Sequence, residues 1–79
     1  MFKKRIGPDP HLNGRMTGGA KGCPDIWELS NGDFAIIGAR QTKKLEQLLP
    51  ESASCSSDEE IVVIPRETLI NAKKDIPEQ

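Results

Sequence analysis

The sequence predicts a small α+β domain with a three-stranded, mainly antiparallel sheet, one or two short helices in the order β-β-α-β-α, and a flexible N-terminal arm. The first observation is an Asn-Gly pair between the apolar runs at 25–29 and 34–39, which is the strongest short hairpin signal. The second is a run of four β-branched residues at 61–64, which predicts a third strand. The chain has 79 residues, enough for one domain.

Residues 1–22 are expected to form a flexible basic arm outside the folded domain. They contain five of the seven glycines and two of the six prolines, and their apolar side chains follow neither the strand nor the helix period. Glycine and proline at this density raise the entropic cost of ordering and interrupt hydrogen-bond ladders. The folded domain is therefore expected over residues 23–79.

Two segments follow the hairpin. Thr42 is expected to cap a helix of about two turns, which carries leucines spaced three and four apart and ends before Pro50. Residues 51–60 form a Ser-rich acidic loop, whose composition cannot bury enough apolar surface to order itself.

The strand at 61–64 is apolar on both faces, which is typical of a central strand or one covered on both sides. Pro65 suits the first turn of a helix over 66–74, which would place Leu69 and Ile70 on its buried face. Trp27, the only tryptophan, is expected to anchor the core. The predicted core comprises Ile26, Trp27, Leu29, Phe34, Ile36, Ile37, Leu45, Leu48, Leu49, Ile61, Val62, Val63, Ile64, Leu69 and Ile70.

The formal net charge of −1 hides an asymmetry, because residues 1–22 carry +4, residues 23–50 carry −1 and residues 51–79 carry −4. No apolar run approaches the roughly 20 residues of a membrane span. The basic start of the chain is followed by Pro, Asp and Gly rather than by the apolar segment of an export signal. We expect a cytoplasmic protein without membrane contact. Cys23 and Cys55 are then expected as reduced thiols, with a disulfide between them as the alternative.

No motif predicts an active site. The Gly-rich stretch at 14–22 lacks the Gly-Lys-Ser/Thr ending of a phosphate-binding loop. A zinc site needs four ligands in paired short spacings, and a cysteine nucleophile needs a nearby base, whereas the only histidine, His11, lies in the expected arm. We therefore expect no enzyme activity, no cofactor, no metal and no small-molecule substrate.

The sequence favours an interaction module that binds another protein, or itself as a homodimer. A three-stranded sheet leaves two edges open, and a core this small rarely supplies more than about 3–5 kcal/mol. The expected surface is a sheet edge together with the helix face of Leu45, Leu48 and Leu49. The alternative is a nucleic-acid-associated regulator, in which the arm contacts phosphates through Lys3, Lys4, Arg5, Arg15 and Lys21. A solubilising tail is the simpler role of the same charges.

Several short motifs carry a resemblance over residues 22–70. The chain resembles a group of short, uncharacterised bacterial proteins that are frequent in actinomycetes. The motifs that carry the resemblance are Gly22-Cys23-Pro24, Trp27-Glu28, Gly32-Asp33-Phe34, Gly38 and Val62-Val63-Ile64-Pro65-Arg66. The resemblance implies a bacterial, cytoplasmic, non-enzymatic protein and transfers no catalytic or binding residue. A weaker one concerns Ile64–Leu69, which is similar to the strand-to-helix segment of swapped-hairpin DNA-binding antitoxins. It is the motivation for the nucleic-acid alternative.

Overall fold

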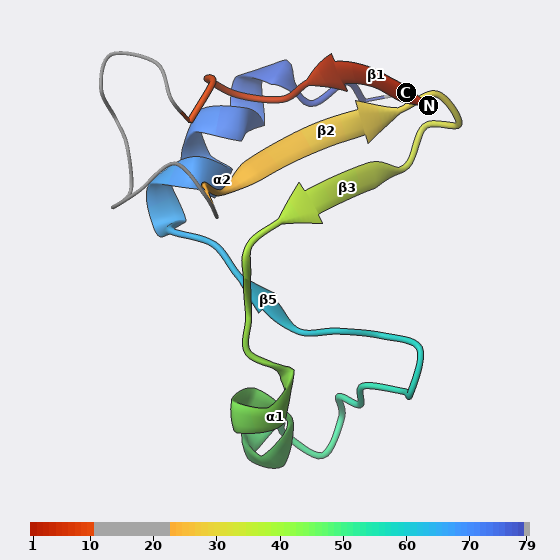
Figure 1. The fold of residues 1–79 in the computed structure, drawn as a ribbon, viewed down its shortest axis with the longest axis vertical. Coiled ribbons are helices and arrows are strands. Elements are labelled where there is room, and N and C mark those ends of the chain that lie inside the picture. The colour runs from red at the N-terminus through yellow and green to blue at the C-terminus, as the bar shows by residue number, and fades with distance from the viewer. Residues whose placement is uncertain (11–22, 79) are drawn as a thin grey trace.

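The computed structural model describes residues 1–10 and 23–78, which form two parts of unlike build. One part, called the body, is a three-stranded sheet with a helix on one face (Figure 1). The other comprises residues 38–64 and extends from the end of the sheet. From here on it is called the arm, and it is distinct from the N-terminal arm expected at residues 1–22. The described fold is the predicted α+β class, with a second, two-stranded sheet in the arm.

The predicted hairpin is confirmed. Strands β2 (Asp25–Leu29) and β3 (Phe34–Ile37) pair antiparallel. The Leu29 N–H donates to the Asp33 carbonyl at 2.8 Å, and the Gly32 N–H donates to the Leu29 carbonyl at 3.0 Å. The turn needs glycine at position 32, where φ is 96°, a left-handed value that side chains with a Cβ rarely adopt.

The third strand of the sheet is β1 (Phe2–Arg5), in the sheet order β1-β2-β3. The prediction of an irregular N-terminal arm is wrong for residues 2–5, since Phe2 lies opposite Leu29 and Arg5 opposite Trp27 in an antiparallel ladder. The strand has no alternating pattern of its own, and pairing along β2 decides its conformation. Residues 11–22 of the expected arm lie outside the described residues.

The strand predicted at 61–64 lies in the arm and not in the main sheet. Its paired part, β5 (Val62–Val63), forms a two-stranded ribbon with β4 (Ala39–Arg40). The expected strand at 34–39 is broken at Gly38, where the chain leaves the sheet (Figure 1). The prediction of a central strand is therefore wrong, and both valines of β5 are exposed.

A short helix stands at the end of the arm. It comprises α1 (Thr42–Leu45) and a 3₁₀ turn, η2 (Glu46–Leu48). The helix is where the sequence placed it, but Thr42 is not its cap, because the capping position is Gln41 and makes no side-chain cap bond. The Thr42 hydroxyl instead accepts the Ile61 N–H at 2.9 Å and bonds the Glu60 carboxylate, so it closes the base of the acidic loop.

The acidic loop is exposed but locally hydrogen-bonded. The Ser56 N–H donates to the Glu59 carboxylate at 3.0 Å, and the Glu59 N–H returns to the Ser56 carbonyl at 3.0 Å. The bond to the Ser56 carbonyl closes a turn, and the bond to the Glu59 carboxylate reinforces it. Local bonds give residues 56–59 a turn without the apolar burial on which the sequence argument relied.

The C-terminal helix, α2 (Arg66–Ala72), continues as a 3₁₀ turn, η3 (Lys73–Asp75). The helix is confirmed, but its predicted face is wrong, because Leu69 and Ile70 are exposed while Ala72 is fully buried. Gly7 has a φ of 86°, and a Cβ built there would lie 3.3 Å from the Ala72 Cα. An approach this close admits only a small residue, and so α2 docks through its alanine.

The core is small. It consists of Ile6, Ile26 and Ala72, with Ile64 packed against them. Trp27 is half-buried rather than a core anchor. The predicted core residues that are exposed are Phe34, Ile36, Ile37, Leu48, Val62, Val63, Leu69 and Ile70.

Gly38→Ala is expected to lower the free energy of unfolding by about 1–3 kcal/mol, as overpacking does. The new Cβ would lie 2.7 Å from the Val63 carbonyl oxygen and 2.8 Å from the Ile64 Cγ2, and a backbone oxygen cannot turn aside. Urea unfolding followed by Trp27 fluorescence measures the change. Ser54→Ala, at an exposed loop position, serves as the control. Equal stability of the Gly38 and Ser54 variants would contradict the close approach.

Candidate interaction surfaces

Strand β3 is the least covered part of the sheet. Phe34 and Ile36 lie opposite Glu28 and Ile26, and Ile26 belongs to the core, so their side chains share the face on which α2 packs. Because α2 is docked at Gly7, next to β1, it does not reach across to β3. Phe34 is 41% exposed and Ile36 is 46% exposed. The outer edge of β3 also lacks a neighbour among the described strands.

Further large apolar side chains are exposed on α2 and on the arm. On α2, Leu69 is 55% and Ile70 is 58% exposed. In the arm, Val62, Val63 and Leu48 are exposed, Leu48 to 73%. We call this set the apolar surface: Phe34, Ile36, Leu48, Val62, Val63, Leu69 and Ile70.

The predicted helix face occupies the far end of the arm. Leu45 and Leu49 are half-buried, and Leu48 is almost fully exposed. Leu45 and Leu48 therefore stand on one short element, α1 with η2, away from the sheet, and Leu49 follows directly after it (Figure 1). Sequence reasoning missed β3 and α2 as parts of the same surface, because it assigned their side chains to the core.

The five basic residues of the predicted N-terminal arm do not form one group in the structure. Lys3 and Lys4 are exposed on β1. Arg5 is held by two acids, and Arg15 and Lys21 lie outside the described residues. The structure thus places two of the five as exposed cations, on a strand rather than on a loose segment.

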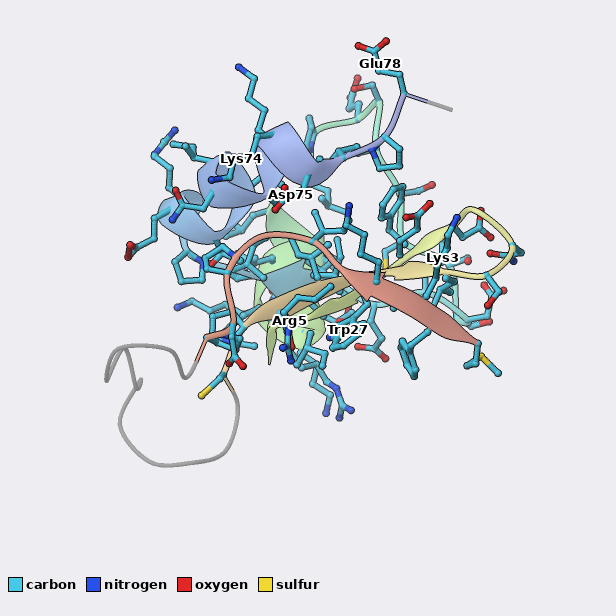
Figure 2. The ribbon with its side chains drawn as sticks, turned by 90° about the horizontal axis from the view of Figure 1, so that it is seen from above. Lys3, Arg5, Trp27, Lys74, Asp75 and Glu78 are labelled. Carbon is cyan, nitrogen blue, oxygen red and sulfur yellow. The ribbon has the colours of Figure 1, made fainter. Side chains whose placement is uncertain are left out.

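Arg5 belongs to a network on the face of the sheet opposite α2 (Figure 2). Its Nε and Nη2 donate to the Asp25 carboxylate, with one contact of 3.1 Å to each oxygen, and its Nη1 donates to Asp9 at 3.3 Å. Hydrogen bonding to Asp25 raises the pKa of the Arg5 guanidinium, aided by the charges of both acids and opposed by burial. The positive charge of Arg5 is therefore paired with acidic groups of the body.

Trp27 completes the network. The guanidinium carbon of Arg5 stands 4.5 Å from the Trp27 ring centroid, a cation–π geometry, and the indole N–H donates to Asp25 at 2.9 Å. Phe2 packs edge-on against the same ring, at 5.8 Å between centroids. The Asp25 carboxylate also accepts the Ile26 N–H at 3.1 Å. With both oxygens accepting charged or ring donors, Asp25 joins β1 to β2 and is poorly placed to act as a base.

A cavity of about 270 Å³ lies between the chain at 6–10, the start of β2 and α2. Its lining is mainly apolar and includes four prolines, together with Thr68 and Asn71. Asp25 reaches it, but its carboxylate is already bonded in the network. Pro10 and Pro24 both border the cavity.

The two cysteines have different surroundings and are not joined in a disulfide. Cys23 is buried at the start of β2, and Cys55 is half-buried in the acidic loop. Desolvation raises the pKa of the Cys55 thiol, and the negative charges of Glu59, Glu46, Glu60 and Asp58 raise it further. A raised pKa keeps the thiol protonated and makes it a weak nucleophile.

Asp25→Asn is expected to lower the free energy of unfolding by about 2–3 kcal/mol, because it removes charge-assisted hydrogen bonds to Arg5. Asp9→Asn, at a side chain that is 44% exposed, should cost less than about 1 kcal/mol. Urea unfolding with Trp27 fluorescence measures both variants. Equal losses would show that the Asp25 network does not hold β1 in place.

Cys55 is expected to react slowly with iodoacetamide below the midpoint of its titration, and that midpoint should lie above that of an unfolded peptide containing residues 51–60. A Cys23→Ser chain leaves Cys55 as the single thiol for this measurement. Salt or Glu59→Gln should lower the midpoint, because each weakens the negative field that disfavours the thiolate. A midpoint equal to that of the peptide in both conditions would contradict the field.

No group of three or more His, Cys, Asp or Glu side chains within residues 1–10 and 23–78 is placed to hold a metal ion. In the same part of the chain, no helix combines the length and apolar content that crossing a membrane requires. No protein-family model, no curated protein and no solved structure matches the chain.

Proposed function

We propose that the protein is a non-enzymatic interaction module that binds protein through the apolar surface. The observation that carries the proposal is the exposure of large aliphatic and aromatic side chains on β3, α2 and the arm. Single exposed apolar residues are ordinary, but contiguous apolar patches mark binding surfaces, and Phe34 and Ile36 lie two positions apart on one face of β3.

The elements that carry these side chains favour a protein partner. Strand β3 combines exposed Phe34 and Ile36 with an outer edge that is unpaired among the described strands. An unpaired edge offers backbone donors and acceptors to another chain, and the side chains beside it supply apolar contact. Lys43, Lys44 and Arg66 are exposed and lie close in sequence to apolar positions of the arm and α2, and charged residues of this kind rim protein interfaces.

The nucleic-acid alternative has weaker support among the described residues. Arg5 is paired with Asp25 and Asp9, which leaves Lys3 and Lys4 as the exposed cations on β1. Two phosphate contacts give a small electrostatic contribution, with a salt slope of about two. The alternative stays a prediction that depends on Arg15 and Lys21.

A photo-crosslinking benzoylphenylalanine at position 34 tests the proposal in living cells, where it replaces one aromatic side chain by another. We expect covalent protein adducts, either to a second copy or to another protein, at a yield severalfold above that of the same probe at Asn31. Asn31 is the matched control because it is exposed at the tip of the β2–β3 turn. Equal, low yields at the two positions would contradict a protein-binding surface on β3. Adducts that a nuclease removes would favour the alternative.

A further inference from the structure

The arm has regular structure without a core of its own. No residue from Gly38 to Ile64 is buried, although the segment contains a two-stranded ribbon and a helical turn. A ribbon with two paired residues in each strand, or a helix of four residues, is not stable alone in water. The ordering of the arm therefore requires a surface that covers it.

The body covers only the base of the arm, where Ile64 packs against the core. The arm leaves the sheet at Gly38 and returns at Ile64, and α1 lies far from the sheet (Figure 1). The apolar side chains of β3 and α2 remain exposed, as do Leu48, Val62 and Val63 of the arm. The apolar surface therefore has two portions on one chain, one on β3 and α2 and one on the arm, and neither covers the other.

The charges on the two parts are also complementary. The loop at 51–60 carries four acidic and no basic side chains, whereas β1 presents Lys3 and Lys4. Figure 1 places β1 at one end of the molecule and this loop toward the other, so the opposite charges do not meet within one chain. A two-fold axis that brings one such pair together across two chains brings together its duplicate as well.

We propose that the partner is a second copy of this chain, and that two copies exchange arms. In this two-fold symmetric dimer, residues 38–64 of each chain pack on the exposed β3 and α2 side chains of the other. The apolar positions of the arm meet Phe34, Ile36 and Leu69 of the partner copy, and the acidic loop approaches its basic β1. The inference rests on the proposed function and names the partner of that surface.

Sedimentation equilibrium of the full chain provides the first measurement. We expect a mass of twice 8.7 kDa, falling toward 8.7 kDa only on strong dilution. A folded monomer at every concentration would overturn the proposal that the partner is a second copy of the chain. If the position 34 probe still gave protein adducts in cells, the proposed function would survive that failure, with a different protein as the partner.

An isotope-filtered NOE spectrum of a mixed dimer, one chain ¹³C-labelled and the other unlabelled, tests the exchange itself. Cross-peaks are expected between the methyl groups of Leu48, Val62 or Val63 in one chain and Phe34 or Leu69 in the other. A dimer whose intermolecular cross-peaks omit the arm would overturn arm exchange.

Leu48→Lys provides the matched substitution, since the Leu48 side chain is 73% exposed and an isolated chain should tolerate the change. In the dimer it places a lysine at each of two symmetric contacts, and the dissociation constant should rise on the order of a hundredfold. Gln47→Lys adds the same charge at the neighbouring exposed position and should have little effect. Retention of a tight dimer by the Leu48 variant, or equal weakening by both variants, would overturn apolar docking of the arm.

Discussion

The pairing of β1 with β2, fixed by the Arg5–Asp25–Trp27 network, is the constraint on which the rest of the body depends. Asp25 binds a guanidinium and an indole N–H, and Arg5 in turn covers the indole ring. This fixes the end of β1, so that the Ile6 N–H bonds the Ile26 carbonyl at 2.8 Å and Ile6 enters the core. Gly7 follows at once, and its N–H donates to the carboxylate of Asp75, the last residue of η3, at 3.0 Å. The helix is therefore positioned by a strand at the opposite end of the chain.

The same docking explains why so much apolar side chain remains outside. A helix that meets the body at a glycine packs through its smallest residue, and α2 does so through Ala72. No other element reaches far enough to cover Leu69 and Ile70, which are left exposed. The core of Ile6, Ile26 and Ala72 is small for the length of the chain, and contact with another chain is one of the ways in which small domains gain further burial.

The Asp25 network and the apolar surface occupy different faces and perform different roles. The first is a satisfied set of polar groups, which stabilises the body and leaves Asp25 no spare acceptor for chemistry. The apolar surface consists of exposed apolar side chains on β3, α2 and the arm. The division between a closed polar network and an open apolar surface is what directs the functional proposal toward binding.

By itself, the sequence determined the elements whose signals are local. The Asn-Gly turn fixed the β2–β3 hairpin, Pro65 marked the start of α2, and the leucine spacing located α1. The same spacing suggested a binding face of Leu45, Leu48 and Leu49, and that role stays a prediction. Tertiary structure alone decided what depends on distant partners. Residues 2–5 became a strand because β2 offered them an edge, and the run at 61–64 left the sheet because Gly38 turns the chain away. Burial followed the same rule, since an apolar side chain is covered only where another element reaches it, and α2 stops short of β3.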